Sequence, residues 1–532
     1  MLTLKKNKFF LLGILILVIG FIFTLQIRKD KLNAPMSGDL EWITAHTLIT
    51  LELWDTEGGP SQFNFSPIYT YPGRGNIYHS PFGGVMEKSG RHYYTSYPPF
   101  AFIFAYYSTK MLGGPDLLSI RTVNLIIHFL CALLLYLIIY KLRKNAKDTF
   151  SIAATTAVLL YLFSVGYLWG HSILYFADTL MQLLVLISIY LLIKLVKGQY
   201  KSQRMILALI GMATFISVYT EWLGLLFAFF YGITLLVFYF KEKKKVFLYS
   251  FWVIGITAIL SLGLTVFQYS SLAGFETLVD VSQMKYQERS GLQEFNTQVV
   301  VYNWNNPRSW FLLDHFLNRN FSMVINLLGI SGFFLIPVLI WRKSRKQIKN
   351  LKWKIIIPLI LVLSVFCHYL ILFNFNAIHN FANLKTALAM IIIIAVIIQI
   401  VEESINWKLN IAFSAILLFL LITRIDRSIR RYQALYDETV FPNQLDKTAS
   451  LIKEYGDPDK YVFSNVFVNP EFIYKSKHLI FPMQDTSGIY GVMDMFQFDK
   501  AQYFYHNDTG GQYMIELVKQ NDHMIPIKRM DF

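Results

Sequence analysis

The sequence predicts a polytopic α-helical membrane protein with about eleven transmembrane helices and a small extracytoplasmic α/β domain at the C-terminus. Its 532 residues are 55% hydrophobic and only 16% charged, whereas soluble domains carry about 25% charged residues. The mean hydropathy is +0.42. The apolar residues gather in repeated runs, and a run of roughly 20 such residues can cross a bilayer as a helix. These observations exclude an ordinary soluble globular protein.

The expected spans follow one another along most of the chain. They are residues 9–27, 119–141, 150–169, 177–197, 205–219, 222–240, 246–268, 321–341, 355–373, 386–401 and 408–423. The stretch 98–112 is apolar but short and contains Lys110, so we expect a helix lying in the membrane interface. Two cysteines, Cys131 and Cys367, both fall inside apolar runs and predict no disulfide framework.

The positions of the basic residues indicate which loops lie in the cytoplasm. A net charge of +15 could point to nucleic acid, but Lys and Arg cluster in short loops between apolar runs, which is the pattern of cytoplasmic loops. We therefore expect no nucleic acid partner. The clusters lie at residues 5–8, 141–147, 197–204, 241–245 and 342–354. The acidic loop 402–408 fits this pattern poorly. The expected location is a bacterial cytoplasmic (inner) membrane, with the active site on the extracytoplasmic side.

This topology predicts four parts. Residues 1–27 form the first transmembrane helix, and residues 28–118 form an extracytoplasmic catalytic loop with interfacial helices. Residues 119–423 form a transmembrane bundle that includes the extracytoplasmic loop 269–320. Residues 424–532 are polar and rich in Tyr and Phe, as expected of an extracytoplasmic α/β domain. Within this last part we expect a helix at 446–455 and strands at 461–463, 479–481 and 502–505.

Ionisable residues near membrane depth are costly and hence candidates for function. Here they collect at the extracytoplasmic ends of the spans. They are Asp39 and Glu41 after the first span, Asp178 and Glu221 at later helix starts, and His379 and Lys385 before the tenth span. Several distant stretches thus bring acids and cations to one face, as a single site built from loops would require.

The same residues could instead have purely structural roles. Asp39, Glu41 and Asp178 could cap helix N-termini, where acids are favoured. Glu221 could form a structural ion pair, and His379 with Lys385 could reach toward the interface. The Tyr-rich loop 67–97, which contains Tyr94 and Tyr97, could be an aromatic belt or could line a groove for a sugar. Glu52, Asp55 and Glu57 are expected on a solvated face.

The order of several short motifs in the first 240 residues is similar to that of a known family. Asp39-Leu40-Glu41 follows the first span, Pro98-Pro99-Phe100 opens the next apolar helix, Gly113-Gly114 and Arg121 come next, and Asp178 begins a later span. This order, over the first 240 residues, resembles the GT-C membrane glycosyltransferases. Within them it is most similar to the group of dolichyl-phosphate-mannose mannosyltransferase-like and lipid A aminoarabinose transferase-like enzymes. The chain departs from that group in the D-x-E spacing, in Tyr97 before Pro-Pro, and in Thr220-Glu221-Trp222.

The resemblance implies a GT-C-like fold and a sugar donor linked to polyprenyl phosphate, with a glycan, lipid or protein as acceptor. An attacking hydroxyl needs a base, and a positioned carboxylate contributes roughly 10²–10⁴-fold. We assign Asp39 as this base, with Glu41 supporting it or binding the acceptor. The leaving phosphate needs fixed cations, for which the candidates are His379, Lys385, Arg121 and Arg91. Asp178, Glu221, Tyr97 and Tyr94 are the candidate substrate contacts.

A single displacement predicts inversion at the anomeric carbon. We expect no cofactor; clustered carboxylates can bind a divalent metal, but the acids are sparse. The competing hypothesis is a transporter or flippase for a lipid-linked or envelope substrate. That class predicts charged residues at the membrane midplane and broken helices at related positions in two halves, and the sequence has neither pattern. A non-catalytic envelope assembly protein is a third alternative.

Overall fold

The computed structural model describes residues 8–36, 40–72, 85–86, 91–143, 150–292, 302, 305–311, 330–332, 345–404, 407–438, 443–457, 459–466, 468–486, 488–495, 499–506, 511–520 and 523–532. The chain divides into two compact units. Unit 1 consists of residues 1–33, 121–265 and 283–435, and unit 2 consists of residues 34–120, 266–282 and 436–532.

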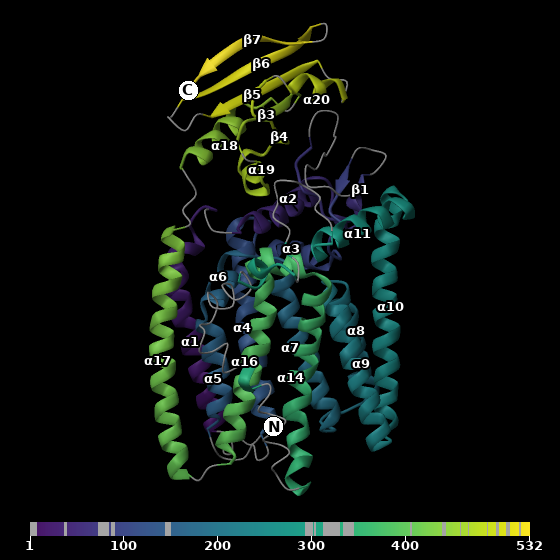
Figure 1. Ribbon diagram of the computed structural model, residues 1–532, viewed down its shortest axis with the longest axis vertical. Coiled ribbons are helices and arrows are strands. Elements are labelled where there is room, and N and C mark those ends of the chain that lie inside the picture. Colours follow the sequence, from purple (N-terminus) through teal and green to yellow (C-terminus); the bar gives the residue numbers. More distant parts are fainter. Residues whose placement is uncertain are drawn as a thin grey trace. The chain divides into compact units, whose positions relative to one another are not determined.

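Unit 1 is a bundle of long apolar helices that run alongside one another (Figure 1). Its helices are α1 (Lys8–Leu32), α4 (Leu117–Leu142), α5 (Ile152–Phe163), α6 (Val165–Ile173), α7 (Ala177–Val196), α8 (Gln203–Val218), α9 (Trp222–Glu242), α10 (Lys245–Ala273), α14 (Arg345–Ile371), α15 (Phe373–Ile378), η4 (Asn380–Asn383), α16 (Leu384–Glu402) and α17 (Trp407–Glu438). α11 (Phe275–Ser290) has residues in both units, and one end of each of α4, α10 and α17 also falls in unit 2.

Within the described residues, six helices are long and apolar enough to cross a membrane, and α5 with α6 makes a seventh if the pair is one broken span. The chain is therefore a multi-pass membrane protein. The described residues therefore account for only part of the expected eleven or so transmembrane helices. α8 and the apolar part of α14 are shorter apolar helices, and most of the expected span 321–341 lies outside the described residues. The expected span 408–423 lies within α17, which continues to Glu438.

The expected single span 150–169 differs in the structure. It consists of α5 and α6, which meet at an angle of 58°. Ser164 between them has extended backbone angles (φ −70°, ψ 139°), so the helical hydrogen bonding stops there. Its hydroxyl donates to the carbonyl of Leu160. A serine side chain can compete in this way with the backbone for helical carbonyls, and nothing in the apolar pattern reveals it.

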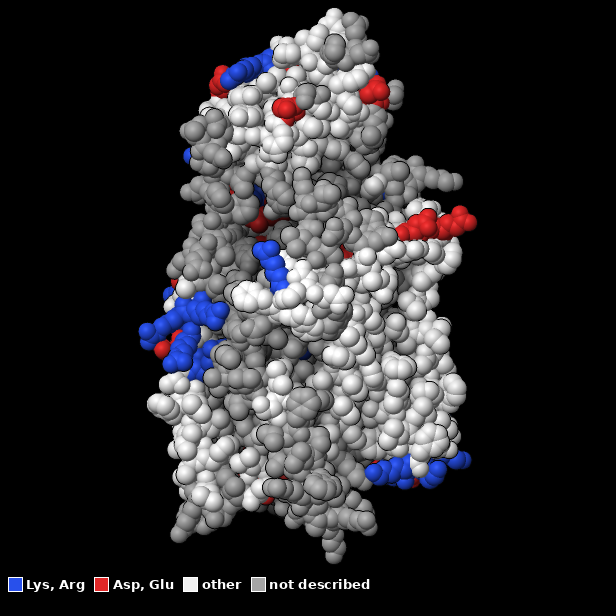
Figure 2. All heavy atoms as spheres, viewed as in Figure 1, with Lys and Arg blue, Asp and Glu red and all other residues white. Residues whose placement is uncertain are grey.

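On the face seen in Figure 2, white uncharged atoms cover the length of α10, while a group of blue Lys and Arg atoms lies at the left, over α17. Blue Lys and Arg atoms also gather at the lower end of the bundle, over the turn between α9 and α10. This turn holds Lys241, Lys243, Lys244 and Lys245. An uncharged flank suits contact with lipid, and exposed residues such as Ile259 and Phe267 of α10 contribute to the apolar surface of that helix.

Unit 2 combines the long loop after α1 with the C-terminal segment. Its elements are α2 (Trp42–Thr56), η2 (Pro60–Phe63), β1 (Val85–Met86), β2 (His92–Tyr93), α3 (Phe100–Lys110), α18 (Asn443–Tyr455), β3 (Tyr461–Ser464), α19 (Pro470–Ser476), β4 (Ile480–Pro482), α20 (Ile489–Met495), β5 (Lys500–His506), β6 (Gln512–Gln520) and β7 (His523–Asp531). The apolar stretch 98–112 forms the helix α3, which begins directly after Pro99; proline suits a helix start because its missing N–H has no helical partner there.

The C-terminal segment folds around a five-stranded sheet of order β4-β3-β5-β6-β7. β3 pairs in parallel with β4 and β5, while β5, β6 and β7 are antiparallel. The expected helix at 446–455 lies in α18, and the three expected strands are β3, β4 and β5. Short parallel strands need crossover connections, which here contain α19 between β3 and β4 and α20 between β4 and β5.

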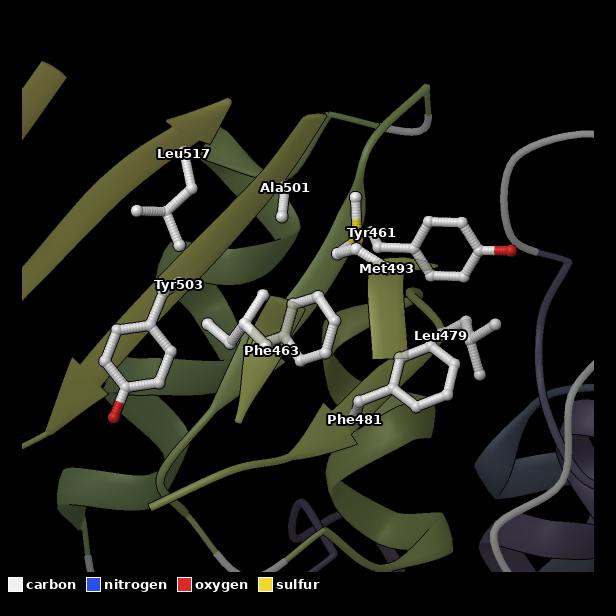
Figure 3. Close-up of a cluster of buried hydrophobic side chains, with 9 residues drawn as sticks. Tyr461, Phe463, Leu479, Phe481, Met493, Ala501, Tyr503 and Leu517 are labelled. Carbon is white, nitrogen blue, oxygen red and sulfur yellow. The ribbon is translucent and has the colours of Figure 1, made fainter. Parts of the chain in front are cut away.

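Apolar side chains from the sheet and α20 form the core of this segment (Figure 3). Phe463 of β3 lies beside Phe481 of β4, with ring centroids 5.4 Å apart. Tyr503 and Leu517 extend the cluster across β5 and β6, and Met493 contributes from α20. The sheet therefore has a continuous apolar face to hold the surrounding segments in place.

Candidate functional site

Three of the predicted site residues meet inside unit 1. The ammonium of Lys385 lies 3.3 Å from Oδ1 of Asp178 and 3.3 Å from Oε1 of Glu221. Each comes from the start of a helix: Asp178 is in the first turn of α7, Glu221 directly precedes α9, and Lys385 is the second residue of α16. All three side chains are at most 5% exposed. Carboxylates are favoured at helix N-termini, and the lysine neutralises part of their charge.

His368 of α14 completes the cluster, and the sequence analysis did not select it. Its Nε2 lies 3.6 Å from Oε1 of Glu221 and 3.4 Å from Nζ of Lys385. The Asn376 amide nitrogen is 3.2 Å from His368 Nδ1, so both ring nitrogens of His368 have polar neighbours. His368 lies inside an apolar run, and only its being a lone histidine at that depth could have drawn attention to it.

The cluster has little free space. The cavity beside Asp178, Gln182, Glu221 and Lys385 has a volume of about 10 Å³, which is about what one water needs. Oδ2 of Asp178 is buried and has no partner among the described residues. The cluster joins the ends of α7, α9, α14 and α16, and the substrate contacts of Asp178 and Glu221 stay predictions. For Lys385 to bind a phosphate, as predicted, its ammonium would have to leave both carboxylates.

Two other predicted phosphate ligands of unit 1 lie in different surroundings. Arg121 of α4 is buried and donates from one guanidinium nitrogen to the carbonyls of Lys31 and Leu32, both at 3.0 Å. It thereby satisfies carbonyls at the end of α1, where helices leave such groups without partners. His379 packs against the rings of Phe375 and Phe381, with centroids 4.7 and 5.1 Å away. The phosphate-binding roles of both residues stay predictions.

The acidic pair after the first span belongs to unit 2. Asp39 lies outside the described residues. Glu41 is 2% exposed and stands at the N-cap of α2, but its side chain makes no capping hydrogen bond. Leu40 between them has φ +70°, a left-handed conformation that is unfavourable for a residue with a branched side chain. The chain therefore turns sharply between the two acids.

Lys475 of the C-terminal segment lies next to this turn. It was not among the residues predicted for the site. Nζ of Lys475 donates to the carbonyl of Met36 at 2.7 Å, to Asp446 at 2.6 Å and to Glu471 at 2.8 Å. Burial raises the pKa of Glu471; the charge of Lys475 opposes this, and the negative charge of Glu41 adds to it. Lys475 thus connects α18, α19 and the chain directly before the acidic pair.

The remaining candidates also lie in unit 2. Tyr94 and Tyr97 are buried; the Tyr94 ring packs on His46 and Tyr69, with centroids 4.7 and 4.6 Å away. The backbone carbonyl of Tyr97 accepts a hydrogen bond from the hydroxyl of Tyr269. Both rings are therefore part of the aromatic packing of unit 2, and their contact with a substrate stays a prediction.

Arg91 and the acids of α2 form ion pairs. Arg91 lies 3.4 Å from Glu57 and stacks over Phe63, 4.8 Å from the ring centroid. Asp55 binds Lys110 at 2.7 Å, and Glu52 binds Lys477 at 2.6 Å. The face of α2 that was expected to be solvated is thus partly covered by ion pairs. Within the described parts of the chain, no group of three or more His, Cys, Asp or Glu could hold a metal ion, and metal dependence stays untested because Asp39 is outside them.

No family model matches the sequence, and no curated protein does. The structure, however, resembles solved glycosyltransferases. The apo oligosaccharyltransferase of Archaeoglobus fulgidus matches with a TM-score of 0.58 and 10% identity, over 92% of this chain and 69% of that one. The same organism's AglB, in complex with an inhibitory peptide and a dolichol-phosphate, matches with a TM-score of 0.55, 11% identity and coverages of 92% and 69%.

A third solved structure matches along almost its whole length. ArnT from Cupriavidus metallidurans bound to undecaprenyl phosphate gives a TM-score of 0.53 and 12% identity, over 99% of this chain and 98% of that one. At such low identity these likenesses concern the fold. The chain has the fold of the GT-C membrane glycosyltransferases, as the resemblance of its first 240 residues predicted.

Proposed function

We propose that this protein is an integral membrane glycosyltransferase that moves a sugar from a polyprenyl-phosphate-linked donor to an extracytoplasmic acceptor. The observation that carries the proposal is the match along 99% of the chain to ArnT, which was solved with undecaprenyl phosphate. The oligosaccharyltransferase with bound dolichol-phosphate supports a lipid phosphate as the leaving group. The proposed location is a bacterial cytoplasmic membrane, with the chemistry on the outer side.

In the proposed reaction, an acceptor hydroxyl attacks the anomeric carbon as the bond from that carbon to the phosphate oxygen breaks. Asp39 takes the hydroxyl proton, and the electron pair of the broken bond leaves with the lipid phosphate. One displacement on one face inverts the anomeric configuration. A carboxylate beside the sugar also stabilises the oxocarbenium-like transition state. Glu41 is buried two residues away and supports the base or orients the acceptor.

Transfer measured in membranes tests this proposal. Radiolabelled polyprenyl-phosphate sugars are supplied to membranes containing the wild type, Asp39→Asn or Asp30→Asn at matched expression. Asp30 is the control because it is exposed at the end of α1 and the substitution removes the same charge. We expect label in a glycan, lipid or protein acceptor with wild type and Asp30→Asn, and at least a 10²-fold lower rate with Asp39→Asn.

Two other outcomes would change the proposal. Equal transfer by Asp39→Asn and wild type would keep the enzyme and move the base to Glu41 or elsewhere. No transfer from any donor by folded wild-type protein would contradict a glycosyltransferase and favour the transporter, which flux measurements on the same membranes would then test.

A further inference from the structure

A cavity lined by basic side chains lies in unit 2. Its volume is about 300 Å³, which is at the lower end of the range for small-molecule sites. Its ionisable lining is entirely basic apart from one tyrosine: Lys453, Lys460, Lys477, His478 and Tyr461. Leu479 and Pro72 supply apolar wall. The site assigned to glycosyl transfer uses none of these residues.

The carboxylates that pair with two of these lysines are not in the lining. Lys477 donates to both oxygens of Glu52, at 2.8 and 2.6 Å, and Lys460 lies 3.2 Å from Asp457 and 3.3 Å from Glu516. Those pairs fix the two ammonium groups in place. They also leave the cavity itself without a negative group among its lining residues.

Lys453 supplies charge that no carboxylate balances. It is exposed on α18 and has no ion pair among the described residues. Burial lowers the pKa of Lys477, Glu52 opposes this, and the positive charge of Lys453 lowers it further. Two ammonium groups that repel each other across a cavity are stabilised when an anion lies between them.

His478 lines the same cavity. Its Nδ1 donates to the carbonyl of Ser476 at 2.8 Å, so Nε2 accepts hydrogen bonds in the neutral ring and can donate to an anion once the ring is protonated. Tyr461 and Leu479 are 2% and 4% exposed and belong to the apolar core, so they form the inner wall of the cavity.

From this arrangement we infer that the cavity binds a small anion that carries a phosphate or carboxylate group. Lys453, which has no ion pair among the described residues, supplies the main charge, and Lys460, Lys477 and His478 line the cavity beside it. The inference goes beyond the proposed function and does not depend on it, because it requires binding and no transfer.

Binding to the full-length protein in detergent tests the inference. The probes are glucose 1-phosphate, glucuronate, inorganic phosphate and neutral glucose. Binding is measured by equilibrium dialysis at two salt concentrations. We expect saturable binding of inorganic phosphate and of the two sugar anions, weaker by about tenfold or more in Lys453→Gln, and weakened by salt. Lys447→Gln, an exposed lysine on the same helix that does not line the cavity, should bind like the wild type.

Lysine acetylation mapped by mass spectrometry locates the ligand in the wild type, so that the result does not depend on a variant's folding. Glucose 1-phosphate should slow acetylation of Lys453 and Lys477 and leave Lys447 unchanged. Binding of neutral glucose as tight as that of glucuronate, equal losses in Lys447→Gln and Lys453→Gln, or no protection of Lys453, would overturn the site itself.

Discussion

At the scale of single residues, Lys385 shows how one side chain can have a predicted role and an observed one. It was expected to bind the donor phosphate, and it lies between two buried carboxylates of other helices. Removing one partner of a buried ion pair costs about 3–5 kcal/mol, because it leaves the other charges buried and unpaired. The structural role therefore has a consequence for stability that can be measured separately from activity.

Lys385→Ala should lower the thermal stability of the purified protein strongly, and Asp178→Asn combined with Glu221→Gln should restore part of the loss in the Lys385→Ala background. Unfolding midpoints in detergent, measured for all variants, check this. If the triple variant is as unstable as Lys385→Ala alone, the ion cluster is not what Lys385 stabilises. If Lys385→Ala is stable but inactive in transfer, the phosphate-binding role is favoured.

The buried His46 makes the stability of unit 2 depend on pH. It is 1% exposed and stacks on Tyr69 with ring centroids 3.9 Å apart. Burial lowers its pKa from 6.5 to about 3. Because the folded pKa is depressed, the unfolded chain binds the proton first as the pH falls, so stability is complete above pH 6.5 and falls below it.

The size of this effect is about 1.4 kcal/mol for each pH unit below 6.5, until the pH approaches the folded pKa. His46→Phe should reduce the loss of stability between pH 7 and pH 5, since phenylalanine cannot bind a proton. Unfolding midpoints at both pH values, for wild type and variant, measure it. An identical drop in the two proteins would show that other groups account for the acid sensitivity.

At the scale of elements, Lys475 makes α19 part of the surroundings of the acidic pair. It holds the carbonyl of Met36 three residues before Asp39, while Leu40 after it is in a left-handed conformation. Backbone strain of this kind costs roughly 1–3 kcal/mol and persists where neighbouring contacts hold it. Lys475 is thus a candidate positioning residue for the proposed base, acting through the backbone and through Glu471.

Lys475→Met should lower the rate of transfer at least tenfold at matched amounts of folded protein. It should also move the acidic limb of the pH–rate profile to higher pH, because a nearby cation favours ionised carboxylates. Lys475→Arg should recover part of the rate, and Lys447→Met on α18 is the control. A rate loss with an unchanged pH profile would mean that Lys475 only supports the fold.

Elements differ in how far the sequence predicts them. Spans such as α4, α7 and α9 follow from runs of about 20 apolar residues, and β3, β4 and β5 follow from short aromatic runs. The strands β6 and β7 were not anticipated; β7 contains Pro526, which disfavours the interior of a strand. The break at Ser164 and the contact of Lys475 with Met36 depend on tertiary structure, which periodicity does not encode. A structural ion pair was one of the alternatives given for Glu221, but its partner Lys385 and the neighbouring Asp178 were not named for it, and His368 was hidden in an apolar run.

At the scale of the whole molecule, the charges predict an orientation. The basic turn at 241–245 is expected in the cytoplasm and residues 424–532 on the other side. A variant without its two native cysteines can carry a single new one, from either Lys243→Cys in this turn or Asp459→Cys in the C-terminal segment. Both positions are exposed.

A membrane-impermeant maleimide reports the side on which each new thiol lies. It should label the Asp459→Cys variant in intact cells, and it should label the Lys243→Cys variant only after the membrane is permeabilised. The variant that lacks all cysteines is the control for background labelling. Labelling of both variants without permeabilisation, or the reverse pattern, would contradict the orientation.

Unit 2 is assembled from residues 34–120, 266–282 and 436–532, and this has a consequence for biosynthesis. The ribosome synthesises the first of these segments long before the last. Lys475 and Lys477, which bind the first segment, are therefore added only after most of the membrane helices have been made. A nascent chain that stops before α18 would leave the carbonyl of Met36 and the carboxylate of Glu52 without Lys475 and Lys477. Such a chain would be a target for quality-control proteases. The C-terminal segment would then protect residues 34–120 from degradation.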